Sequence, residues 1–131
     1  MLTAKEFSRW LDGYRDAFLT FNAEVAGDLF SEVAMYYESP FAQPIEGRSN
    51  IVAYWRMVAT VMHDVEFGFE VLATTGDVGV ARVTDTLTRV PSGRRVGYDG
   101  IFFARFDKGL RCEEFREWWV ELPAGSEPAT T

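Results

Sequence analysis

Near the N-terminus, apolar residues recur every three or four positions, which is the spacing that places side chains on one face of an α-helix. The residues of this face are Phe7, Trp10, Leu11, Tyr14, Phe18 and Phe21. Thr3 and Glu6 precede it with the spacing of a capping box, in which each side chain accepts a hydrogen bond from the other residue's backbone N–H. The pattern predicts one long amphipathic helix.

A short helix and a strand are predicted next. Gly27-Asp28 indicates a break, followed by a second helix that carries Leu29, Phe30 and Val33. Residues 35–41 (MYYESPF) are rich in aromatic side chains and predict a first strand, which ends at Pro40 because proline supplies no backbone donor.

A third helix is predicted after the small polar capping residues of Gly47-Arg48-Ser49-Asn50. Its apolar positions are Ile51, Tyr54, Trp55, Val58 and Met62. From Asp64 onward the period changes to two, which predicts strands near 65–74, 78–90, 95–107 and 110–122. Short turns containing glycine separate them, so we expect an antiparallel meander.

The order of elements predicts an α+β fold: a curved antiparallel sheet wrapped on three N-terminal helices, with a cone-shaped internal cavity. Residues 1–122 form a single domain in this interpretation. Residues 123–131 (PAGSEPATT) are small and polar, and we expect them to be disordered.

One predicted strand is apolar on both faces. Tyr98, Phe102 and Phe106 alternate there with Ile101 and Phe103. A two-layer domain buries only one face of its sheet, so the outer face needs a second cover. We expect a homodimer through that face.

The charge balance excludes several partners. The 131 residues include 13 Lys+Arg and 20 Asp+Glu, for a formal charge of −7. Nucleic-acid binders carry a basic footprint, so no nucleic-acid partner is expected. An acidic surface is also repelled by anionic membranes.

Cysteine usage and the N-terminal sequence favour a cytoplasmic location. Cys112 is the single cysteine, so no intrachain disulfide can form. The first ten residues, MLTAKEFSRW, lack the basic-then-apolar pattern of a signal peptide. Without a cysteine cluster or a second histidine besides His63, no metal site is predicted. His63 would instead cap the C-terminus of the third helix, and Cys112 would be a small packed side chain.

Three segments, together with the order of elements, resemble the nuclear transport factor 2-like superfamily, and within it the SnoaL-like and ketosteroid-isomerase-like branch. They are AGDLF (26–30), the run from YYESPF (36–41) to EGRSNIVAYW (46–55), and FREWW (115–119). The resemblance covers roughly residues 5–122 and implies a cystatin-like cone. The superfamily includes isomerases, dehydratases, polyketide cyclases, epoxide hydrolases and non-catalytic binding domains, so the fold alone does not identify a reaction.

The resemblance also implies roles for particular residues. In an ungapped comparison with the ketosteroid isomerase pattern, the oxyanion-binding tyrosine falls on Tyr14 and the general-base carboxylate falls on Glu38. A slip of one residue would place Ser39 at the base position and remove the base. The family's second oxyanion acid falls on Phe102, which is a departure, and Asp99 nearby lies on the opposite strand face.

Each candidate has a structural alternative. Glu38 is either a base in an apolar pocket or a solvated carboxylate at a strand end. The hydroxyl of Tyr14 meets either a ligand or a protein partner. Asp85 lies in the row of Ala81, Val83 and Leu87, so it is either a second carboxylate in the cavity or one half of a structural ion pair.

The leading hypothesis is a cofactor-free isomerase, cyclase or dehydratase that acts on an apolar carbonyl substrate. Glu38 would be the base, Tyr14 a donor to the oxyanion, and Asp85 a second acid or an orienting group. The competing hypothesis is a non-catalytic domain that binds a hydrophobic ligand or serves as a dimeric partner. The residues expected to line the cavity are Phe18, Tyr36, Phe41, Trp55, Val83, Phe102 and Trp118.

Overall fold

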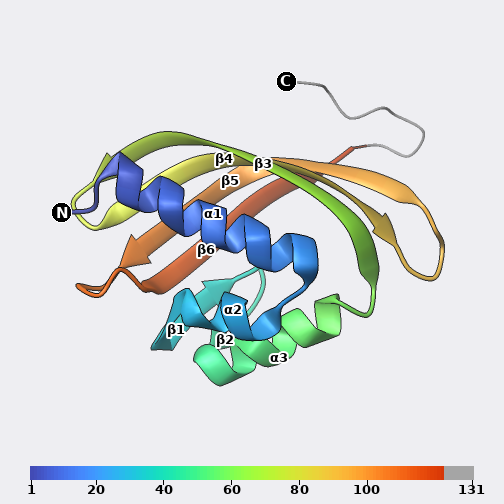
Figure 1. Cartoon of the computed structure of the whole chain (residues 1–131), viewed down its shortest axis with the longest axis horizontal. Helices are drawn as coiled ribbons and strands as arrows, with labels where there is room; N and C mark the ends of the chain where they lie inside the picture. Colours follow the sequence, from blue (N-terminus) through green and yellow to red (C-terminus); the bar gives the residue numbers. More distant parts are fainter. Residues whose placement is uncertain (123–131) are drawn as a thin grey trace.

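The computed structural model describes residues 1–122 and starts with the predicted long helix, α1 (Ala4–Thr20) (Figure 1). The capping box forms as expected: the Thr3 hydroxyl accepts from the Glu6 N–H at 3.0 Å, and the Glu6 carboxylate accepts from the Thr3 N–H at 2.9 Å. Phe21 ends the helix in a left-handed conformation. The segment predicted to be disordered, 123–131, lies outside the described residues.

The second helix is shorter than predicted. Helix α2 (Ala23–Asp28) is capped by Asn22, and the chain turns directly into strand β1 (Phe30–Tyr37). The prediction of a helix through Phe30 and Val33 is therefore wrong. Phe30 is fully buried in β1 and Val33 points to solvent, because β1 pairs with a strand from the far end of the chain.

Strand β1 ends earlier than the sequence indicated, and the loop that follows carries an unpredicted strand. Glu38 comes directly after β1, while strand β2 (Ile45–Glu46) pairs antiparallel with Met35 and Tyr36. Helix α3 (Arg48–Val58) follows Gly47, its N-cap residue, whose φ of 84° is a conformation that favours glycine.

The predicted meander is confirmed in the strands β3 (Met62–Thr75), β4 (Val78–Arg89), β5 (Arg95–Phe106) and β6 (Cys112–Glu121). Each pairs antiparallel with the next. The sheet order is β2-β1-β6-β5-β4-β3, and the β1–β6 pair is parallel. The sheet is therefore mixed at one position, where the sequence predicted a fully antiparallel sheet. Met62, which the apolar spacing predicts to be part of the third helix, starts β3 instead.

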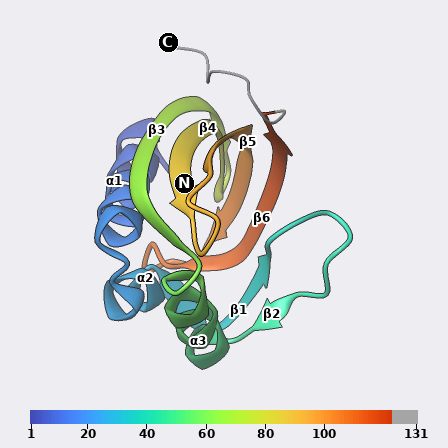
Figure 2. The ribbon, with the colours of Figure 1, turned by 90° about the vertical axis from the view of Figure 1, so that its right-hand side faces the viewer.

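The sheet is strongly curved and unclosed, and the helices lie against its concave side (Figure 2). Register shifts interrupt the β3–β4 pairing between His63 and Glu66 and between Val71 and Ala73. Such irregularities bend a strand and increase its twist. The predicted α+β cone is thus confirmed.

The concave face and α1 form an aromatic core. Trp10 and Tyr14 of α1 pack against Phe115 of β6 with ring centroids 5.8 Å and 5.7 Å apart. Phe102 of β5 packs edge-on against Tyr14 at 5.1 Å. The core fills the end of the cone beside the N-terminus and leaves the other end free for a pocket.

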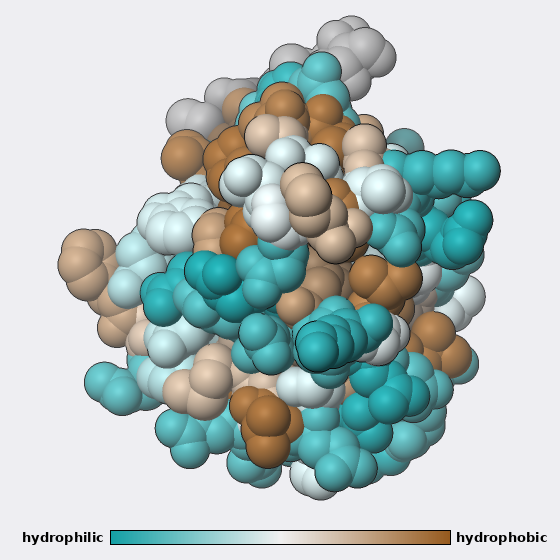
Figure 3. Space-filling model, turned by 90° about the vertical axis from the view of Figure 1, so that its left-hand side faces the viewer, coloured by the Kyte–Doolittle hydropathy of each residue, from teal (hydrophilic) through white to brown (hydrophobic). Residues whose placement is uncertain are grey.

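The surface is more hydrophilic than the aromatic core. On the face shown in Figure 3, hydrophobic residues stand in small groups among hydrophilic ones. Among the described helices, none is both long enough and apolar enough to cross a membrane.

Candidate functional site

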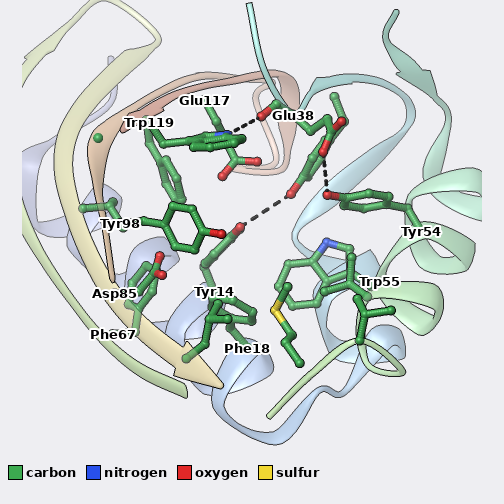
Figure 4. Close-up of a pocket in the computed structure, with 18 of the residues that line it drawn as sticks. Tyr14, Phe18, Glu38, Tyr54, Trp55, Phe67, Asp85, Tyr98, Glu117 and Trp119 are labelled. Carbon is green, nitrogen blue, oxygen red and sulfur yellow. Dashed lines mark hydrogen bonds between the residues drawn. The ribbon is translucent and has the colours of Figure 1, made fainter. Parts of the chain in front are cut away.

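A pocket of about 330 Å³ lies between the curved sheet and the helices α1 and α3. This volume lies in the range of small-molecule sites. Its wall combines aromatic side chains with three carboxyl groups, those of Glu38, Asp85 and Glu117 (Figure 4). The contributing elements are α1, the end of β1, α3, the start of β3, β4, β5 and β6.

Asp85 reaches the pocket from β4, in the row of buried residues that also contains Val83 and Leu87. Burial raises the pKa of the Asp85 carboxyl to about 7. Its Oδ1 atom is buried and has no hydrogen-bond partner among the described residues. Asp85 forms no ion pair among the described residues. Two arginines that could have paired with it are bound elsewhere: Arg105 pairs with Asp77 and Glu114, and Arg116 pairs with Glu114.

Glu117 is a pocket carboxyl that the sequence analysis missed. It lies on β6 opposite Phe102 of β5 and extends into the pocket between β6 and Tyr14 (Figure 4). Burial, with a smaller contribution from the negative charge of Asp85, raises the pKa of Glu117 to about 8, while the Tyr36 hydroxyl opposes the shift. Alternate residues of a strand lie on the same face, so Glu117 shares a face with Phe115, two positions before it in FREWW. Phe115 is fully buried, and Glu117 therefore also points inward.

Glu38 lies at the pocket wall immediately after β1. Its carboxylate accepts a hydrogen bond from the Tyr54 hydroxyl of α3 at 3.0 Å. Its backbone carbonyl accepts one from the Trp119 indole at 2.9 Å. Glu38 is thus hydrogen-bonded to residues of both α3 and β6, and its side chain is only partly exposed. Ser39, the alternative at the base position, is not among the residues that line the pocket.

Tyr14 presents its hydroxyl to the pocket from α1. The oxygen lies 3.5 Å from the hydroxyl oxygen of Tyr36 on β1. Burial is the main reason that the pKa of both phenols is raised well above its usual value. Both hydroxyls therefore keep their protons and can donate hydrogen bonds across the whole physiological range.

A polar cluster borders the pocket where β4, β5 and β6 meet. The hydroxyl of Tyr98 donates to Glu121 at 2.8 Å, and the Arg89 guanidinium contacts both residues. Arg89 and Tyr98 line the pocket, so its wall includes one cation that is already paired with a carboxylate.

The structure brings most of the predicted lining residues together. Those that line the pocket are Phe18, Tyr36, Trp55, Val83, Phe102 and Trp118. Phe41 does not line it and is 99% exposed, because the chain leaves β1 at Tyr37 and Phe41 lies in the loop beyond. Trp118 borders the pocket, but it pairs with Ile101, which is the pair next to Phe102 and Glu117. Because neighbouring pairs point to opposite faces of the sheet, Trp118 starts from the outer face.

The single histidine and the single cysteine both lie in strands. His63 lies on β3, where Nδ1 is 2.8 Å from a carboxylate oxygen of Asp64, so it does not cap a helix C-terminus. Cys112 is a buried residue at the start of β6, and its pKa is raised by that burial.

Comparison with known protein families matches a SnoaL-like domain to residues 11–114, which is most of the chain. The match includes the part of α1 that carries Tyr14, the end of β1, α3 and the strands that carry Asp85 and Phe102, and it ends before Glu117. No curated protein matches the chain.

Proposed function

We propose that this chain, which belongs to the SnoaL-like domain family, is a cofactor-free enzyme that transfers protons on an apolar carbonyl compound. Family membership indicates a small-molecule-binding or isomerase-type domain. The observation that supports catalysis is the convergence of Glu38, Asp85 and Glu117 on one aromatic pocket. Asp85 and Glu117 have pKa values near neutrality, which suits groups that accept and return protons at working pH.

In the proposed reaction, the Glu38 carboxylate removes a proton from the carbon next to the carbonyl. The C–H electron pair becomes the C=C bond of an enolate, and the negative charge moves to oxygen. The Tyr14 hydroxyl donates a hydrogen bond to that oxygen. In a substrate whose next carbon–carbon bond is a C=C bond, the enolate is conjugated with it, and protonated Glu38 returns the proton to the far carbon of that bond. The double bond moves into conjugation with the carbonyl, which yields an isomer without any other reactant.

Asp85 and Glu117 support this chemistry as a pair. Burial raises the pKa of both carboxyls, and the negative charge of Asp85 raises that of Glu117 further, so the pocket accommodates two ionised carboxylates poorly. At neutral pH Glu117 is mostly protonated and Asp85 is near its midpoint. We assign Asp85 as the second acid, whose burial keeps it partly protonated, and Glu117 as a protonated neighbour that can donate a hydrogen bond.

The reaction can be tested without knowing the natural substrate. Bicyclic ketones such as 1-tetralone and 2-decalone are incubated with the protein in D₂O, and deuterium uptake next to the carbonyl is followed by NMR. We expect uptake above the buffer rate, and a loss of about 100-fold or more in Glu38→Gln. Glu46→Gln, an exposed change on β2, serves as the control and should keep full activity.

The alternative, a non-catalytic domain that binds a hydrophobic ligand, makes the opposite prediction. Ketones would then bind without exchanging deuterium, and Glu38→Gln would change nothing. That result would remove the proposed activity and leave the binding function.

We also propose a homodimer through the convex face of the sheet. Ile101 and Phe103 are only partly buried in the single chain, and Trp118 remains 42% exposed. Exposed apolar residues gathered on one face are typical of an interface with a second copy.

A further inference from the structure

The indole N–H of Trp55 is a buried hydrogen-bond donor without a partner among the described residues. Trp55 lies on α3, is 4% exposed and lines the pocket. Figure 4 shows the nitrogen edge of its indole turned toward the side of the pocket where Tyr54 and Glu38 lie. The donor therefore faces the same region as the proposed base.

Two other indoles in the structure do have partners. Trp10 donates to the carbonyl of Leu29 at 2.9 Å, and Trp119 donates to the carbonyl of Glu38 at 2.9 Å. A buried donor that is left unpaired costs free energy, and for this reason buried polar groups are nearly always hydrogen-bonded. Trp55 is thus an exception that calls for a partner from outside the chain.

Neighbouring aromatic rings restrict the rotation of the Trp55 indole. Tyr14 packs edge-on against it with ring centroids 5.2 Å apart, and Phe18 does so at 5.9 Å. These contacts fix the direction of the N–H. A fixed donor in an apolar wall is the kind of group that orients a bound molecule.

We propose that the Trp55 indole N–H binds a hydrogen-bond acceptor of the ligand, a carbonyl oxygen, and so determines how the ligand lies relative to Glu38. An indole nitrogen only donates, so its partner must be an acceptor. The ring of Phe102 carries no donor at the position where the family resemblance implied a second acid, and Trp55 supplies a donor from α3 instead. The identification of the acceptor as a carbonyl rests on the proposed function.

The test compares two probes that differ only at the acceptor, 2-acetonaphthone and 2-ethylnaphthalene. Their dissociation constants are measured by calorimetry with the wild type and with Trp55→Phe. We expect the wild type to bind the ketone about 5- to 50-fold more tightly than the hydrocarbon, and the variant to lose this preference. Because both probes lose the same ring contacts in Trp55→Phe, the ratio of their constants isolates the N–H.

Trp118→Phe is the matched control, since it also removes an indole that borders the pocket, and the preference for the ketone should survive in it. A second measurement needs no variant at the site: in ¹⁵N-labelled wild type, the Trp55 indole proton should shift downfield with the ketone and not with the hydrocarbon. The preference should also persist at pH 9, because an indole N–H does not ionise there, unlike the carboxyls of Asp85 and Glu117.

An unchanged ratio in Trp55→Phe, or failure of the wild type to bind the ketone, would overturn the assignment. This outcome is distinguishable from failure of the proposed function. Deuterium exchange that depends on Glu38 could persist with an unchanged ratio, and loss of the ketone preference in Trp55→Phe could occur in a protein that exchanges no deuterium.

Discussion

Asp85 and Glu117 are two acids in one pocket, and neither forms an ion pair within residues 1–122. The cost of this arrangement depends on pH. Each carboxyl has a higher pKa in the folded chain than in the unfolded chain, so the folded state holds more protons between pH 4 and 8. Stability from these groups is therefore fully present below about pH 4 and is lost as pH rises toward 7 and 8.

Asp85→Asn should remove part of this loss. We expect the variant to match the wild type near pH 4 and to be more stable by about 2–4 kcal/mol near pH 9, where the wild type must ionise a buried acid. Urea denaturation at a series of pH values measures the difference.

Asp99→Asn is the comparison for this experiment. Asp99 is bound by Arg82 on the outer face, and that hydrogen bond lowers its pKa, so its removal should bring no gain at high pH. Equal pH profiles for the wild type and Asp85→Asn would show that Asp85 ionises as easily in the folded chain as in the unfolded one.

The sequence predicted some of these residues and not others, for a physical reason. Asp85 could be placed inward because Val83 and Leu87 on either side are clearly apolar. Glu117 lies between Arg116 and Trp118, with further glutamates upstream, so its inward direction becomes evident only once Phe115 is known to be buried. The orientation of the Trp55 nitrogen depends on packing against α1 and cannot be inferred from one sequence.

At the scale of elements, Gly100 determines how closely β5 and β6 approach. A Cβ atom built there would lie 2.0 Å from the carbonyl oxygen of Trp118 and 2.8 Å from the Cα of Trp119. These are backbone atoms of the strand that carries Glu117, so they cannot move without displacing β6. Glycine is required here for space.

Gly100→Ala should therefore destabilise the protein by about 1–3 kcal/mol, as overpacked sites do. Thermal unfolding by circular dichroism measures the loss. Gly68→Ala on β3 is the control, because its Cβ would meet only the Thr84 hydroxyl at 3.6 Å, an ordinary contact. A Gly100→Ala protein as stable as the control would show that the two strands can separate slightly at no cost.

The helices and the meander were predictable because their signals are local: the capping box, the apolar face of α1 and the turns between strands. The start of β1 could not be predicted from a local signal. Leu29, Phe30 and Val33 form a short apolar run that fits either a helix or a strand. Pairing with β6, which is distant in sequence, decides the outcome, and it also makes that pair parallel.

At the scale of the whole molecule, the proposed dimer can be tested directly. We expect sedimentation to give a dimer at micromolar concentration, and Ile101→Glu to give a monomer that keeps its circular dichroism spectrum. A new charge on the convex face would have to be buried without a partner in the dimer. A wild-type monomer at these concentrations would contradict the proposal.

The position of β6 has a consequence for how the chain is made. Among residues 1–122 it is the last strand in sequence, yet it lies between β1 and β5 and joins the two halves of the sheet. A ribosome releases residues 112–121 only after the other described elements have emerged. During synthesis, β1 and β2 are therefore made before the strand that β1 pairs with in the sheet. Contacts between such distant segments also slow folding. We therefore expect the pocket to be completed only after translation of this segment, and a chain that stops before Cys112 to expose the unpaired backbone edge of β5.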